Sequence, residues 1–168
     1  MSSLLIILLL LIGASLQTLL AAPVVLGLAG GPILLGLTLC IALRIDRPRA
    51  LLTGLLAGVL HDAFCPAPLG VSIPFFLLIA LGVHALREEV FGDQIITYAV
   101  LGLLGALSKT LYFTLVLSVA GLRPFGIAPL AVHLLGNGLL GLVATPLIFL
   151  LISRLPSGRV FRQRRWIA

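Results

Sequence analysis

Charged residues are scarce in this chain. Of 168 residues, 11 are Lys or Arg and five are Asp or Glu, which is 10% in total, while 61% are hydrophobic. A soluble domain needs a far larger share of charged side chains to cover its surface. The composition therefore excludes an ordinary soluble fold and predicts that lipid surrounds most of the side chains.

Reactive and metal-binding patterns are also missing. The two cysteines, Cys40 and Cys65, are expected near opposite membrane faces, so we predict neither a disulfide nor a metal site. The sequence has no Gly-x-Ser-x-Gly elbow, no His-Glu-x-x-His motif and no phosphate-binding loop. Asp62 is the single acid within the apolar runs, which excludes a two-aspartate intramembrane protease. We therefore expect a protein that is not an enzyme and has no cofactor.

Apolar runs make up most of the remaining sequence. They cover residues 4–22, 24–43, 50–65, 71–86, 95–120 and 129–152. A helix needs about 20 apolar residues to cross a bilayer, so the sequence predicts an all-α, polytopic membrane bundle of six transmembrane helices. Gly30-Gly31-Pro32 interrupts the second run, which predicts a kink or a late helix start. The first run follows no Lys or Arg, and we interpret it as a retained helix rather than a signal peptide.

Positive charges indicate how the helices are oriented. With six crossings, the loop from Arg44 to Arg49, the loop at Arg87 and the C-terminal arginines fall on one side, and Arg123 falls on the other. The positive-inside rule then places both termini in the cytoplasm. We interpret the net charge of +6 as this orientation signal and expect no nucleic-acid partner.

The same reasoning divides the chain into two parts. Residues 1–153 are expected to form the transmembrane domain, and residues 154–168 a basic cytoplasmic tail. In this tail we expect an anchor at the membrane interface, formed by Arg162, Arg164, Arg165 and Trp166.

Three polar residues are predicted to share one depth. At about 1.5 Å per helical residue, Asp62, Lys109 and Asn137 lie roughly 17, 21 and 18 Å from the cytoplasmic side. A buried ion pair between Asp62 and Lys109, supported by Asn137, would let each charge satisfy the other. We interpret this pair as structural, and a proton or substrate relay is the alternative.

Small residues share faces with these polar groups. Gly54, Gly58 and Asp62 follow four-residue steps, so they lie on one helical face, where another helix can approach closely. Gly102 and Gly105 accompany Lys109 in the fifth run, and His133 and Gly141 accompany Asn137 in the sixth. The spacing predicts three packed helical faces that are rich in glycine.

One block of sequence resembles a known family. It reads Gly54-Leu55-Leu56-Ala57-Gly58-Val59-Leu60-His61-Asp62, followed after a short turn by Leu69-Gly70, with Asn137 and Thr145-Pro146-Leu147 in the last run. This block, the length and the six apolar runs resemble the bacterial rod shape-determining MreD family. The family's motif aspartate corresponds to Asp62, and its glycines correspond to Gly54, Gly58 and Gly70.

The resemblance implies a scaffold role. It leads us to expect a non-enzymatic, multi-pass protein of the bacterial inner membrane that binds the transmembrane helix of MreC. Further expected partners are the glycosyltransferase and the penicillin-binding transpeptidase of the cell-wall elongation complex. Members of the family are similar in fold to the substrate-binding subunits of vitamin transporters. A small-solute transporter subunit of that type is therefore the alternative function.

Overall fold

The structure is a computed structural model that describes residues 3–20, 32–64, 70–86, 95–121 and 127–154. In these ranges the chain is all-helical and contains no strand. The helices are α1 (Ser3–Leu20), α2 (Ile33–Ala42), α3 (Arg47–Phe64), α4 (Ser72–Leu86), α5 (Ile95–Val119) and α6 (Ile127–Arg154). The predicted all-α class is confirmed for the described residues.

The helix boundaries follow local chemistry. Of the two predictions for the second run, the late start is the one observed, because α2 begins at Ile33, directly after Pro32. α3 begins at Arg47, three residues before the apolar run. Pro48 lies in its first turn, where a proline costs no hydrogen bond because the N–H there has no helical partner. An apolar pattern misses this charged first turn, since charge alone does not prevent helix formation.

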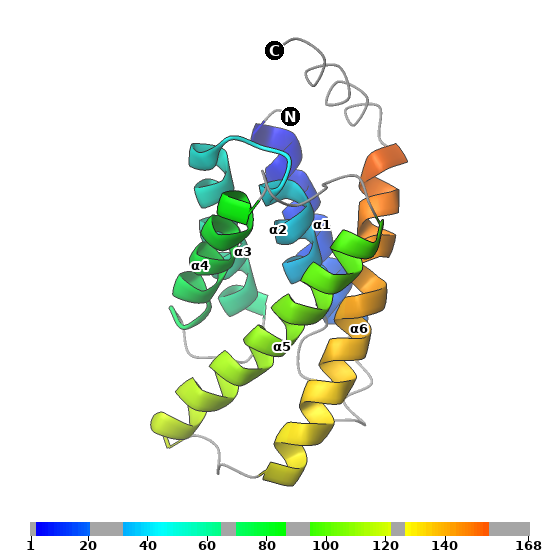
Figure 1. Cartoon of the computed structure of the whole chain (residues 1–168). Helices are drawn as coiled ribbons and strands as arrows, with labels where there is room; N and C mark the ends of the chain where they lie inside the picture. Colours follow the sequence, from blue (N-terminus) through cyan, green and yellow to red (C-terminus); the bar gives the residue numbers. More distant parts are fainter. Residues whose placement is uncertain (1–2, 21–31, 65–69, 87–94, 122–126, 155–168) are drawn as a thin grey trace.

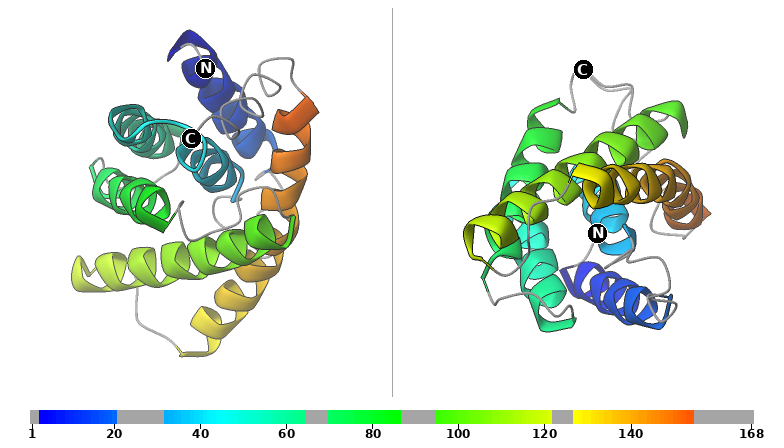
Figure 2. Two further views of the ribbon diagram at one scale, coloured as in Figure 1. Left: turned by 45° about the horizontal axis from the view of Figure 1, so that its top comes forward. Right: turned by 90° about the horizontal axis from the view of Figure 1, so that it is seen from below.

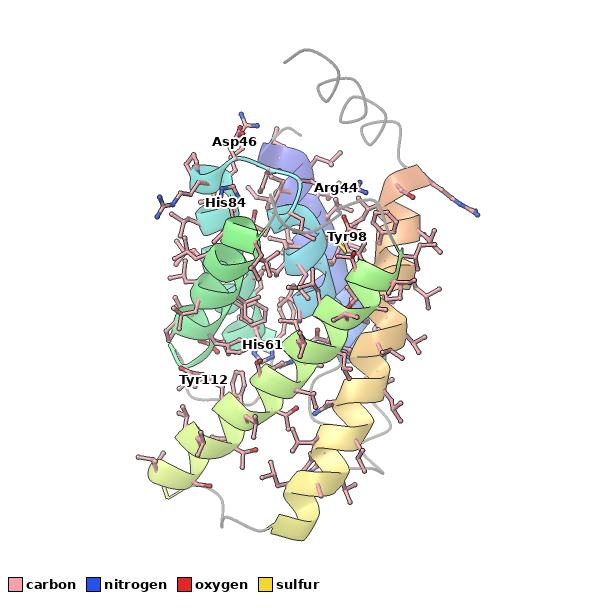
Figure 3. The ribbon with its side chains drawn as sticks, viewed as in Figure 1. Arg44, Asp46, His61, His84, Tyr98 and Tyr112 are labelled. Carbon is pink, nitrogen blue, oxygen red and sulfur yellow. The ribbon has the colours of Figure 1, made fainter. Side chains whose placement is uncertain are left out.

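The six helices alternate in direction (Figure 1). The start of α1, the end of α2, the start of α3 and the end of α6 therefore lie at the same end of the bundle. Arg44 and Asp46 mark that end in Figure 3. α6 contains Pro146 and curves along its length (Figure 2), as expected where a proline removes one backbone hydrogen bond.

α2 forms the centre of the bundle. Nine of its ten residues are buried, and it packs against α1, α3, α4, α5 and α6, as Figures 1 and 2 show. Its first turn is buried as well, and the Leu34 N–H donates to the Gln17 side-chain oxygen at 3.0 Å. Gln17 of α1 thereby satisfies a donor that has no partner within its own helix.

Glycines bring two pairs of helices into backbone contact. A Cβ on Gly54 would lie 2.8 Å from the Phe76 carbonyl oxygen, and a Cβ on Gly58 would lie 2.6 Å from the Ile73 Cα. Both glycines therefore lie against the backbone of α4. Gly102 and Gly141 face each other in the same way, because a Cβ on either one would clash with the carbonyl oxygen of the other. Gly105 lies instead against Leu35 and Leu39 of α2.

The outer surface is apolar. Large exposed hydrophobic side chains lie on α1, α3, α4, α5 and α6, including Leu4, Val59, Leu78, Leu115 and Leu151. Two segments, Ile95–Val119 and Leu130–Arg154, are long and apolar enough to cross a membrane, and only 28% of each is buried inside the protein. Core helices of soluble proteins are mostly buried, so these two helices have the pattern expected of helices that face lipid.

We predict that Gly102→Ala destabilises the protein, although alanine favours helices. The added methyl group must push α5 away from α6, and such overpacking costs about 1–3 kcal/mol. Gly82→Ala in α4 is the matched control, because a Cβ there meets nothing within 4 Å. We expect the control to be neutral, or more stable by up to about 1 kcal/mol from helix propensity. Denaturant unfolding in mild detergent measures both, and equal effects would contradict the close α5–α6 contact.

Candidate functional site

Asp62 joins the end of α3 to the start of α4. Its side chain is 5% exposed. One carboxylate oxygen accepts a hydrogen bond from the Gly70 N–H at 2.7 Å. The Ser72 N–H donates to both carboxylate oxygens, at 3.2 and 3.3 Å. Asp62 therefore caps the first turn of α4 from a position ten residues earlier in the chain.

This arrangement stabilises the negative charge without a cation. Hydrogen bonds to a carboxylate are stronger than those between neutral groups, and the N-terminus of a helix carries a partial positive charge. Gly70 has a φ of +94°, a backbone conformation that residues other than glycine rarely adopt. The role of Gly70 is therefore to turn its N–H toward Asp62. The predicted motif residue Leu69 lies outside the described residues.

His61 contacts the same serine from the preceding position. Its Nδ1 lies 2.8 Å from the Ser72 hydroxyl oxygen, and Ser72 is fully buried. The imidazole ring packs against the rings of Phe76 and Phe113, with centroid distances of 5.4 Å in both cases. Two consecutive residues of α3 thus contact Ser72. Asp62 binds the Ser72 backbone N–H, and His61 contacts the Ser72 hydroxyl group.

α5 completes this cluster through Tyr112. The Tyr112 hydroxyl donates to the Val71 carbonyl oxygen at 3.0 Å, and its ring lies 5.3 Å from that of Phe75. We call Asp62, His61, Gly70, Ser72 and Tyr112 the turn site. Figure 3 shows His61 and Tyr112 about halfway down the bundle, away from the end marked by Arg44. The turn site fixes three helices, α3, α4 and α5, to one short segment of backbone.

The other members of the predicted polar layer lie on α5 and α6. Asn137 donates from its amide nitrogen to the Thr110 hydroxyl at 3.1 Å, directly beside Lys109 in the sequence. Lys109 is 9% exposed and lies close enough to His61 to act on it electrostatically. The described contacts of Asp62 do not include Lys109, so the ion pair between them stays a prediction.

The remaining predicted site residues divide into two groups. Gly54, Gly58, Gly102, Gly105 and Gly141 all lie against other helices of this chain. The proposed interface anchor of Arg162, Arg164, Arg165 and Trp166 lies outside the described residues. His133, the third polar member of the α6 face, is half-buried.

Sequence reasoning did not find the part played by Ser72, His61 and Tyr112. The sequence contains one signal for Ser72 and one for Tyr112. Ser72 lies at the start of the apolar run 71–86, which is the usual place for a serine that caps a helix. A buried tyrosine normally has a hydrogen-bond partner for its hydroxyl group, and Tyr112 lies within an apolar run.

Comparisons with protein-family models, curated proteins and solved structures find no match to this chain. The chemistry of the turn site is therefore argued from its geometry. Serine and histidine are two of the three members of a nucleophilic triad, in which the acid orients the histidine. In the turn site, Asp62 contacts the Ser72 backbone N–H and not His61. Within the described ranges, no three His, Cys, Asp or Glu side chains lie together as a metal site would require. The geometry supports helix attachment.

We predict that Asp62→Ala lowers the free energy of unfolding by about 1–3 kcal/mol, because the buried Ser72 N–H and the more exposed Gly70 N–H lose their acceptor. Asp62→Asn should cost less, since the amide oxygen can still accept from Gly70. Ser72→Ala is the control: it removes the His61 contact but keeps the Ser72 backbone N–H. The measurement is denaturant unfolding in mild detergent. An unchanged stability for Asp62→Ala would show that the carboxylate does not hold α4.

A double-mutant cycle tests the expected ion pair directly. If Asp62 and Lys109 interact, Asp62→Asn and Lys109→Met each reduce stability, and the double variant recovers part of the loss. Unfolding measurements on the four proteins give the coupling energy. Additive losses would show that the two residues act independently and that the turn site alone explains the burial of Asp62.

Proposed function

We propose that this protein crosses the bacterial inner membrane six times with both termini in the cytoplasm. The observation that carries this proposal is the apolar outer surface of α1, α3, α4, α5 and α6. The alternating helix directions add support, because they bring Arg44, Arg47 and Arg154 to one end of the bundle, as the positive-inside rule requires. α4 has 15 residues and rises about 22 Å, a mismatch that local thinning of the bilayer accommodates.

Within that membrane setting, we propose an MreD-type scaffold that is not an enzyme. It would bind the transmembrane helix of MreC and support peptidoglycan synthesis by the glycosyltransferase and the penicillin-binding transpeptidase of the elongation complex. The residues that resemble the family support this role. The α3–α4 attachment involves Gly54, Gly58, Asp62 and Gly70. We expect residues with such a structural role in a scaffold.

Most of the predicted glycines lie inside the bundle, which limits where a partner helix can bind. Gly54 and Gly58 already contact α4, and Gly102 and Gly141 contact each other, so these glycines are not available to a partner helix. Gly82 is different, because the space beside it is open. It lies on the outer face of α4 with Leu78 and Leu86, which are 67% and 45% exposed. A small residue flanked by exposed leucines lets another membrane helix approach closely, so we place the partner helix there.

Co-purification tests both the scaffold and its surface. We expect tagged protein to retain co-expressed full-length MreC in mild detergent, and Gly82→Leu to reduce the amount retained about tenfold, which corresponds to one close helix contact. Leu135→Phe on the exposed face of α6 is the matched control, because it enlarges an apolar side chain away from α4. We expect this control to retain MreC normally.

Two results would contradict these proposals in different ways. Equal retention by Gly82→Leu and the control would place the partner on another face. Failure of the unmodified protein to retain MreC, together with tight binding of a vitamin in equilibrium dialysis, would replace the scaffold with a transporter subunit.

A further inference from the structure

Three helix ends meet around the ring of Phe149, near the end of the bundle that Arg44 marks and away from the turn site. The guanidinium carbon of Arg44, just after α2, lies 4.8 Å from the centroid of this ring. The ring of Tyr98, in the first turn of α5, stacks on Phe149 with a centroid distance of 4.0 Å and an interplanar angle of 21°. Arg44 and Tyr98 are close together in Figure 3. We call Arg44, Tyr98 and Phe149 the aromatic–arginine site.

Phe149 contacts the guanidinium, and Tyr98 packs against Phe149. Tyr98 is fully buried and Phe149 is 7% exposed, so neither ring can turn away without opening the core. One turn before Arg44, the Cys40 thiol approaches the Thr145 carbonyl oxygen at 3.8 Å, and Gly36 lies against Thr145 and Ile148. α2 is therefore fixed against α6 in the turns that precede Arg44. The Arg44 side chain is already ordered in the folded protein, so it loses little further conformational entropy when a ligand binds.

The N–H groups of this guanidinium remain available. The cation–π contact with Phe149 is not a hydrogen bond, so it uses none of the five N–H donors of the guanidinium. In the part of the chain that the structure describes, no carboxylate pairs with Arg44 and no acceptor receives a hydrogen bond from its side chain. Asp46, two residues further on, is exposed. Arg44 itself is half-buried, so part of this residue is accessible from outside the bundle.

We propose that the aromatic–arginine site binds the phosphate group of an anionic phospholipid at the cytoplasmic face. A guanidinium presents two parallel N–H groups that match two phosphate oxygens. Basic positions between helices on this side of a membrane are where anionic headgroups bind. The acyl chains would lie along the apolar surface of α6, where Leu147 and Leu151 are 59% and 72% exposed. This inference rests on the membrane placement of the proposed function, and it does not depend on the scaffold role.

Native mass spectrometry of the full-length protein tests the proposal. The protein is released from nanodiscs of phosphatidylcholine that contain 10–20 mol% phosphatidylglycerol (about one charged lipid in five to ten). We expect retained phosphatidylglycerol on the unmodified protein and a loss of about tenfold or more in Arg44→Gln, the size expected for a charged hydrogen-bonded contact. Arg154→Gln is the matched control, because it removes one exposed arginine from the same end of the bundle. We expect the control to retain the lipid.

Two further variants separate a held arginine from charge alone. Phe149→Leu keeps the cation and removes the ring beneath it, so we expect it to lose phosphatidylglycerol as well. Arg44→Lys keeps the charge without the paired N–H groups, and we expect retention between that of the unmodified protein and that of Arg44→Gln. Thermal unfolding of each variant shows which are folded, and Arg44→Lys is the variant least disruptive to the fold.

Three outcomes would overturn the proposal. Equal loss in Arg44→Gln and Arg154→Gln would show a general charge effect. Normal retention in folded Arg44→Gln would show that the headgroup binds elsewhere. Displacement of the lipid by millimolar inorganic phosphate, with the same dependence on Arg44, would identify a free phosphate as the ligand. None of these outcomes affects retention of MreC, so the two proposals fail separately.

Discussion

The carboxylate of Asp62 is the contact on which the α3–α4 hairpin depends. In an apolar environment every backbone N–H needs a partner, and the first N–H groups of a helix cannot find one within it. Asp62 accepts from Gly70 and Ser72, so α4 starts at a fixed point beside the end of α3. With that point fixed, Gly58 and Gly54 lie against the α4 backbone about one and two turns away from Asp62, and His61 and Tyr112 attach the same segment to the aromatic cluster.

The sequence was a good guide to where helices occur and a poor one to what they contact. Apolar runs predicted all six described helices, and Gly30-Gly31-Pro32 correctly raised the possibility that α2 starts late. Asp62 was expected to pair with Lys109 because both lie at a similar depth, and this pair stays a prediction. Depth follows from residue number and helical rise, whereas contact also depends on rotation about the helix axis and on the path of the connecting turn. The donors that Asp62 uses belong to the backbone, which no side-chain pattern reveals.

Glycine spacing has the same limit. Four-residue steps correctly place Gly54 and Gly58 on one face, but they do not say whether that face meets another helix of the same chain or a partner. In the described part of this protein these glycines contact other helices of the same chain, and Gly102 and Gly141 lie so close that neither has room for a Cβ. A scaffold assembled in this way has a rigid interior. Its partners would then recognise the outer surface of a fixed bundle, and Gly82 offers the closest approach on α4.

Asp62 and Arg44 differ in how their charges are satisfied, and the difference follows from where they lie. An ionised group far from the membrane surface must find its partners within the protein, because lipid chains supply none. Asp62 accordingly takes three contacts from the backbone of its own chain. Arg44 lies at the end of the bundle that also holds Arg47 and Arg154, with its guanidinium carbon over the Phe149 ring and its side chain half-buried. In the proposed membrane setting, a cation held in that way at the interface would meet headgroups rather than protein acceptors. The carboxylate of Asp62 serves the α3–α4 attachment, and the end of the bundle at Arg44 is where we propose that the protein binds an anion.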